Sequence, residues 1–143
     1  MRKSELMTLW NVESWSVEPY GVYFVSRRLG TNCLENVGQA FQKLNISCTG
    51  YIEAEVLSLP MWEQLYTQLD ELDQLAKVLI QKGIPQEESI VLTLTDIMLD
   101  KSGCYDAFAL GYDVGESPAG HLYVLVPFDE NFTAQQDVIY ETL

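Results

Sequence analysis

A long amphipathic segment near the middle of the chain constrains the fold more than any other feature. Between positions 60 and 82, apolar residues recur at intervals of three and four, at Trp62, Leu65, Leu69, Leu72, Ala76 and Leu79. This spacing predicts an α-helix with one apolar face. Ser58 is a candidate N-cap, and Gly83 with Pro85 ends the pattern. The helix has about 23 residues and a length of about 35 Å, so it needs a second layer to cover its apolar face.

Segments of alternating apolar and polar residues predict that second layer. Five strands are expected at Gly21–Leu29, Tyr51–Leu57, Ile90–Thr95, Tyr105–Asp113 and His121–Phe128, and Val12–Val17 would add a sixth. The last two of the five are joined by Val114–Gly120 and predict a hairpin in the centre of the sheet. A second helix is expected from Asn32 to Asn45, and a short third one from Thr133 to Tyr140.

The order of these elements, β-α-β-α-β-β-β, predicts an α+β fold. We expect a five- or six-stranded, mainly antiparallel sheet with the two main helices on one face. The 143 residues are consistent with a single domain that spans residues 1–143. Small residues at Ala107, Ala109 and Gly111 are expected to leave room for a helix to pack closely on their face of the sheet.

The charge of the chain limits its partners. It has 21 Asp and Glu residues against 8 Lys and Arg, a formal net charge of −13, although 48% of its residues are hydrophobic. This combination is typical of a folded acidic domain, because a disordered acidic tail lacks apolar residues. The 42 residues after Lys101 contain seven acids and no Lys or Arg. Such a field repels nucleic acids and anionic membranes and attracts cationic partners.

Targeting and redox signals point to the cytoplasm. No apolar run approaches the roughly 18 residues that a membrane span requires. Arg2 and Lys3 are followed by acids and not by an apolar run, so no secretion signal is expected. Cys33, Cys48 and Cys104 lack metal-binding or disulfide spacing and are expected to be reduced thiols. We expect no cofactor.

Few residues suggest catalysis. His121 is the one histidine, and Asp113 and Glu116 are near enough in sequence to orient it. Glu53 and Glu55 are two apart on an expected strand, where they would share a face, as paired carboxylates or as a divalent cation site with Asp96 or Asp100. A solvated outer face explains the pair better. We therefore expect a protein that is not an enzyme; the alternative is a small carboxylate-dependent enzyme that uses Glu53, Glu55 and His121.

The surface favours recognition of a basic protein by a monomer or weak dimer. Acidic groups steer a cationic partner, and tyrosines are frequent at interfaces. The expected contact residues combine acids of the second strand, of the long helix and of the last hairpin with one tyrosine: Glu53, Glu55, Asp70, Glu71, Asp73, Glu116 and Tyr51. An acidic adaptor subunit or a DNA mimic remains an alternative.

Three stretches carry a resemblance to a known family. GVYFVSRRLGTNCLENVGQAFQKL, TGYIEAEVLSLPMWEQL and SIVLTLTDIML resemble the small acidic immunity proteins of bacterial polymorphic-toxin systems, in particular immunity protein family 22. The similarity covers Gly21 to Leu99 and does not extend to the region after Cys104. It implies that the chain binds and neutralises a cognate toxin and has no catalytic activity. The acidic surface makes a nuclease one class of such a toxin, because nucleases carry a basic cleft for their polyanionic substrate. The resemblance assigns no functional residue.

Overall fold

The chain forms one sheet with helices on one of its faces. The computed structural model describes residues 1–29, 41–83, 92–117, 120–135 and 138–142. Within them, three helices and seven strands follow in the order α1 (Lys3–Leu9), β1 (Val12–Glu18), β2 (Gly21–Leu29), β3 (Phe41–Thr49), α2 (Glu53–Ser58), α3 (Trp62–Lys82), β4 (Thr93–Asp100), β5 (Phe108–Ser117), β6 (Gly120–Phe128) and β7 (Ile139–Thr142).

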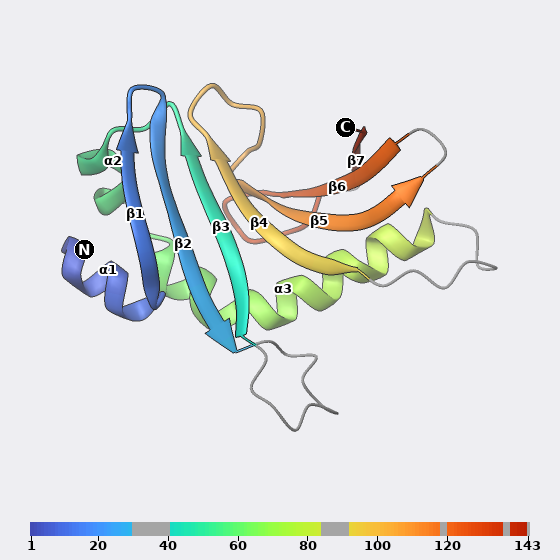
Figure 1. Cartoon of the computed structure of the whole chain (residues 1–143), viewed down its shortest axis with the longest axis horizontal. Coiled ribbons are helices and arrows are strands. Elements are labelled where there is room, and N and C mark those ends of the chain that lie inside the picture. Colours follow the sequence, from blue (N-terminus) through green and yellow to red (C-terminus); the bar gives the residue numbers. More distant parts are fainter. Residues whose placement is uncertain (30–40, 84–91, 118–119, 136–137, 143) are drawn as a thin grey trace.

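Strands that are neighbours in the sheet are also neighbours in the sequence. The order runs from β1 to β7, and every adjacent pair is antiparallel except β3 and β4. A parallel pair requires a crossover connection, which α2 and α3 supply. Figure 1 shows α3 running along one side of the sheet, from the first strands toward the β5–β6 hairpin.

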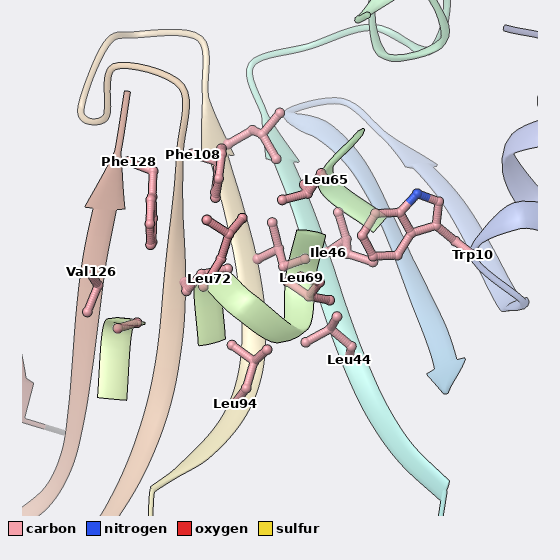
Figure 2. Packing of buried hydrophobic residues seen from close by; sticks show 14 of the residues in the cluster. Trp10, Leu44, Ile46, Leu65, Leu69, Leu72, Leu94, Phe108, Val126 and Phe128 are labelled. Atoms are coloured by element: carbon pink, nitrogen blue, oxygen red, sulfur yellow. The ribbon is translucent and has the colours of Figure 1, made fainter. Parts of the chain in front are cut away.

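The hydrophobic core lies between α3 and the sheet. Alternate residues of the central strands point into it and are buried, among them Phe24, Leu44, Ile46, Ile97, Leu110 and Val126. The helix contributes Trp62, Leu65, Leu69, Leu72, Ala76 and Ile80. Figure 2 shows the leucines of α3 lying over side chains of β3 and β4. Leu6 and Trp10 close the core beside β1, where the ring of Trp10 meets Trp62 edge to face at 6.0 Å.

Several sequence expectations are confirmed. Strand β2 has the predicted bounds, the expected strand at Val12–Val17 is β1, and β5 and β6 pair as a hairpin. The hairpin was expected in the centre of the sheet, but the central strand is β4. The long helix is α3, and its predicted apolar face is buried apart from Leu79, which is only partly buried. The α+β class and the mostly antiparallel sheet also hold, but the sheet has seven strands where five or six were expected.

Two elements between β2 and α3 were predicted wrongly. Residues 41–45 belong to strand β3 and not to a helix, because Leu44, Ile46 and Cys48 alternate into the core and β3 pairs with β2 along its length. The rest of that expected helix, residues 32–40, lies outside the described residues. The expected strand Tyr51–Leu57 is mostly helix α2. The Glu55 carboxylate turns back to accept a hydrogen bond from the Ile52 N–H at 3.0 Å, which closes the first turn.

The remaining differences concern the second half of the chain. Strand β4 begins at Thr93, and positions 90–91 of the expected strand lie outside the described residues. Described residues of the expected helix Thr133–Tyr140 are extended, with a bridge at Ala134 and strand β7 from Ile139. At Gly111, side chains of the neighbouring strands occupy the place expected for a helix: a Cβ there would lie 3.2 Å from a methyl of Leu125 and 3.0 Å from Cβ of Asp96. The small residue makes room for those side chains.

The packing of α3 predicts a clear difference between two leucines of the same helix. Leu69→Ala should lower the free energy of unfolding by about 2–5 kcal/mol, because Leu69 is fully buried and its removal leaves a cavity. Leu75→Ala is the matched control: Leu75 is 44% exposed and should change stability far less. Urea denaturation followed by circular dichroism measures both. Equal decreases in the free energy of unfolding of the two variants would contradict the packing of α3 on the sheet.

Candidate functional site

The acids that were expected to form one contact surface lie in separate places. Glu53 and Glu55 are on helix α2, so their predicted common strand face does not exist. The Glu53 carboxylate accepts a hydrogen bond from Trp15 Nε1 at 2.8 Å and lies 3.5 Å from Lys3 Nζ. Glu55 forms an ion pair with Lys101, and this contact and its hydrogen bond from Ile52 lower the pKa of Glu55. Both carboxylates are therefore neutralised within the protein.

The three acids expected on the long helix differ from one another. Asp70 is exposed and its Oδ1 lies 2.6 Å from Nη2 of Arg28. Glu71 is exposed. Asp73 is buried, contrary to the prediction: its Oδ1 accepts a hydrogen bond from the Tyr112 hydroxyl at 2.6 Å, and Lys77 Nζ lies 3.2 Å from Oδ2. Asp73 directly follows Leu72 of the apolar face in the sequence. The hydroxyl of Tyr112 gives its buried carboxylate a hydrogen-bond donor.

A cavity at one end of the sheet contains the best candidate site. It has a volume of about 390 Å³ and lies where β3, β4 and β6 end and β5 begins, between the segment before α3 and two loops. Its apolar lining comes from Tyr51, Leu59, Pro60, Met61, Leu99, Ala107 and Phe132, and its acids are Asp106 and Glu130. A second hollow of about 270 Å³ shares both acids and adds Asp129 and Asn131. The two hollows have these acids in common, and we call them together the acidic pocket.

Of the residues expected to contact a partner, only Tyr51 lines the acidic pocket. Burial is the largest cause of the raised pKa of its hydroxyl. Asp106, Asp129 and Glu130 are among the seven acids after Lys101, but nothing in their spacing predicted that they lie close together. A signal was available in the run Asp129-Glu130-Asn131, which follows a strand and has the composition of a turn.

The loop after β6 holds one wall of the acidic pocket in place. The Asp129 carboxylate accepts hydrogen bonds at 2.9 Å from the backbone N–H groups of Asn131 and Thr133. Phe132 has a φ of 62°, a left-handed conformation that is unfavourable for a bulky side chain. Its ring packs edge to face on Phe108, with 5.4 Å between centroids. These contacts hold the aromatic ring at the pocket wall despite the strained backbone.

His121 lies between the two carboxylates that were expected to orient it. Its Nδ1 is 2.9 Å from Glu116 Oε1 and its Nε2 is 2.7 Å from Asp113 Oδ1. A neutral imidazole donates only one hydrogen bond, so this arrangement favours the imidazolium form. Gly115, with a φ of 104° at the irregularity of β5, lies between the two acids in sequence. An imidazolium held in this way has no free lone pair to act as a general base.

The other candidate centres are weaker. Within the described residues, no group of three or more His, Cys, Asp or Glu side chains is arranged to hold a metal ion. Asp96 accepts a hydrogen bond from the neighbouring Thr95 hydroxyl, and Asp100 accepts one from the Ser102 hydroxyl. Burial raises the pKa of the Cys48 thiol to about 12, so it is unreactive at neutral pH. Cys48 and Cys104 are free thiols, and Cys33 lies outside the described residues.

The buried position of Asp73 predicts that it supports folding and not binding. Asp73→Ala should lower the free energy of unfolding by roughly 1–3 kcal/mol, because the buried Tyr112 hydroxyl loses its carboxylate partner. Asp70→Ala, one turn away, removes an exposed ion pair and should cost about 0–1 kcal/mol. Thermal and urea unfolding of the two variants compare them directly. Equal decreases in the free energy of unfolding of the two variants would contradict the burial of Asp73.

The carboxylates around His121 predict a pH dependence with a definite sign. Hydrogen bonding by Glu116, and next by Asp113, raises the pKa of His121 above its ordinary value of 6.5. The cationic form therefore stabilises the folded state at low pH, and this contribution is lost as pH rises through the folded-state pKa. An NMR titration measures this pKa directly, because His121 is the one histidine of the chain. Glu116→Gln with Asp113→Asn should return its pKa toward 6.5; a wild-type pKa at or below that value would exclude the arrangement.

No protein-family model matches the chain, and neither curated proteins nor solved structures contain a match. The described part of the chain also has no helix that is both long and apolar enough to cross a membrane. The case for a function therefore comes from the charges and the geometry of this molecule.

Proposed function

We propose that the chain is an acidic inhibitor that binds and neutralises a basic protein. Following the resemblance to immunity proteins, the partner is a bacterial toxin domain, and a nuclease is the first class to test. A nuclease carries a basic surface for its polyanionic substrate, which an acidic protein can cover and block. On this proposal the chain works by binding alone.

The observation that carries this proposal is that the Lys and Arg side chains pair with some carboxylates of the chain and leave others without a cationic partner. Among the described residues, five Lys and Arg side chains form ion pairs with acids that are also described: Lys3, Arg28, Lys43, Lys77 and Lys101. They neutralise carboxylates on α2, on α3 and on β1. In the described residues, no Lys or Arg pairs with Asp106, Asp129 or Glu130, whose hydrogen-bond partners are neutral where they have any. These three carboxylates at one end of the sheet therefore have no cationic partner in the described residues, and exposed acids elsewhere, such as Glu71, add to the negative surface.

The alternative enzyme receives less support from the geometry. It required Glu53, Glu55 and His121 to act together. Helix α2 lies beside β1 and β2, whereas the β5–β6 hairpin lies at the opposite side of the sheet (Figure 1). Each of the three side chains has its own ionic partners. A DNA mimic would share the acidic surface, and competition between DNA and the chain for a DNA-binding protein distinguishes it from an inhibitor with another target.

The proposal predicts a salt-dependent complex with a cationic protein. The protein encoded by the reading frame beside this gene is the first partner to test, by co-expression for protection of cells and by surface plasmon resonance for binding. The association rate constant should fall as salt rises toward about 0.5 M, because electrostatic steering is then screened within a few ångströms.

Charge variants make this test specific. Glu71→Lys reverses an exposed charge and should slow association, whereas Glu71→Gln should have a smaller effect in the same direction. The dissociation rate should change little if Glu71 acts only through steering. If the purified chain neither binds the neighbouring protein nor protects cells that express it, the proposed function is wrong for that partner and the inhibitor class loses its main support.

A further inference from the structure

We propose that the acidic pocket receives one arginine side chain from the basic partner. This inference rests on the proposed function and adds the point of contact. A binding surface for a protein gains most of its affinity from a few residues that fill pockets. The acidic pocket combines apolar walls with carboxylates that have no cationic partner in the described residues.

The walls of the pocket suit the stem and the flat head of arginine. Leu59, Pro60, Met61 and Leu99 offer apolar surface for the methylene groups, which long cationic side chains bury readily. Tyr51 and Phe132 line the same cavity and supply aromatic rings. A guanidinium group stacks on aromatic faces because it is planar and weakly hydrated.

The acids of the pocket suit the positive charge. Asp106 and Glu130 line both of its hollows and are exposed at its rim. Asp106 accepts a hydrogen bond from Gln135 at 3.4 Å, a neutral donor that leaves its charge uncompensated. Asp129 adds a third carboxylate to the outer hollow. A carboxylate accepts two parallel hydrogen bonds from a guanidinium, and such charge-assisted pairs are among the strongest hydrogen bonds in proteins.

The pocket is also formed in the absence of any partner. The Asp129 hydrogen bonds and the packing of Phe132 on Phe108 fix the loop after β6. Strained residues such as Phe132 persist where surrounding contacts determine the conformation, and they concentrate at binding sites. A preformed wall lowers the ordering cost of binding. Lysine would satisfy the charge, but its ammonium group is strongly hydrated and cannot make the forked contact, so arginine fits better.

An isosteric pair of small probes tests this chemistry. N-acetyl-arginine amide should shift the NMR signals of Tyr51, Phe132, Asp106 and Glu130 in a saturable way, with a dissociation constant on the order of 1 mM. N-acetyl-citrulline amide has nearly the same shape without the charge and should produce no saturable shift. Nα-acetyl-lysine amide, whose side-chain ammonium group is free, should bind more weakly than the arginine probe. Equal shifts from arginine and citrulline, or shifts outside the pocket, would overturn the proposal.

Two single variants connect the pocket with the protein partner. Asp106→Asn and Glu130→Gln keep the shape of the side chains, and each should weaken both the arginine probe and the partner complex about tenfold. Glu71→Gln is the control, since it removes one charge from an exposed position that does not line the pocket.

The outcomes separate this inference from the proposed function. If both pocket variants bind the partner as tightly as Glu71→Gln does, the arginine anchor is wrong and the inhibitor function stands. If the wild-type chain binds no basic protein although the arginine probe enters the pocket, the proposed function fails, and the assignment of the arginine to a partner protein fails with it.

Discussion

The parallel pairing of β3 with β4 determines most of the architecture. Parallel neighbours cannot be joined by a short turn, so the chain must leave the sheet after β3 and cross one face before it returns. The crossover contains α3, whose apolar side covers that face from Phe24, which meets Trp62, to Tyr112, which meets Asp73. The same pairing brings the carboxyl ends of β3 and β4 together, with Thr49 opposite Asp100. The acidic pocket lies at that end of the sheet.

The electrostatic character of the surface follows from this arrangement as much as from composition. Carboxylates near the crossover have cations within reach, because Lys101 at the end of β4 meets Glu55 of α2 and Arg28 of β2 meets Asp70 of α3. The loops that follow β6 and precede β5 have none in the described residues. The unpaired carboxylates of these two loops therefore add to the negative field at their end of the sheet.

The fold was partly readable from the sequence because some segments carry one unambiguous period. The stripe of α3 and the alternation of β2 needed no other information. Phe41–Asn45 was ambiguous: Phe41 and Leu44 are three apart, as in a helix, while Leu44 and Ile46 are two apart, as in a strand, and pairing with β2 decides between them. The segment Glu53–Ser58 alternates like a strand but forms a helix of six residues, whose first turn is closed by the Glu55 carboxylate.

The site was harder to predict than the fold. Interactions between residues close in sequence were visible, such as those of His121 with Asp113 and Glu116. The acidic pocket depends on long-range geometry, because Tyr51, Leu99, Asp106 and Glu130 come from four separate parts of the chain. The burial of Asp73 also depends on a residue that is distant in sequence. Its polar character indicated exposure, and only the position of Tyr112 explains its burial.

The sequential order of the sheet also divides it into two meanders, β1–β3 and β4–β7, whose strands pair with one another through the ladder between β3 and β4. Within each meander, strands pair with their immediate neighbours in sequence, whereas the ladder between β3 and β4 pairs Asn45 with Asp96. Closing so long a loop costs more chain entropy than closing a hairpin. The two meanders should therefore form early in folding, and docking across the central ladder should complete it. Because the acidic pocket takes residues from both sides of that ladder, it should be the last part of the surface to form. Pulse-labelled hydrogen exchange would show this as late protection of the amides that pair β3 with β4.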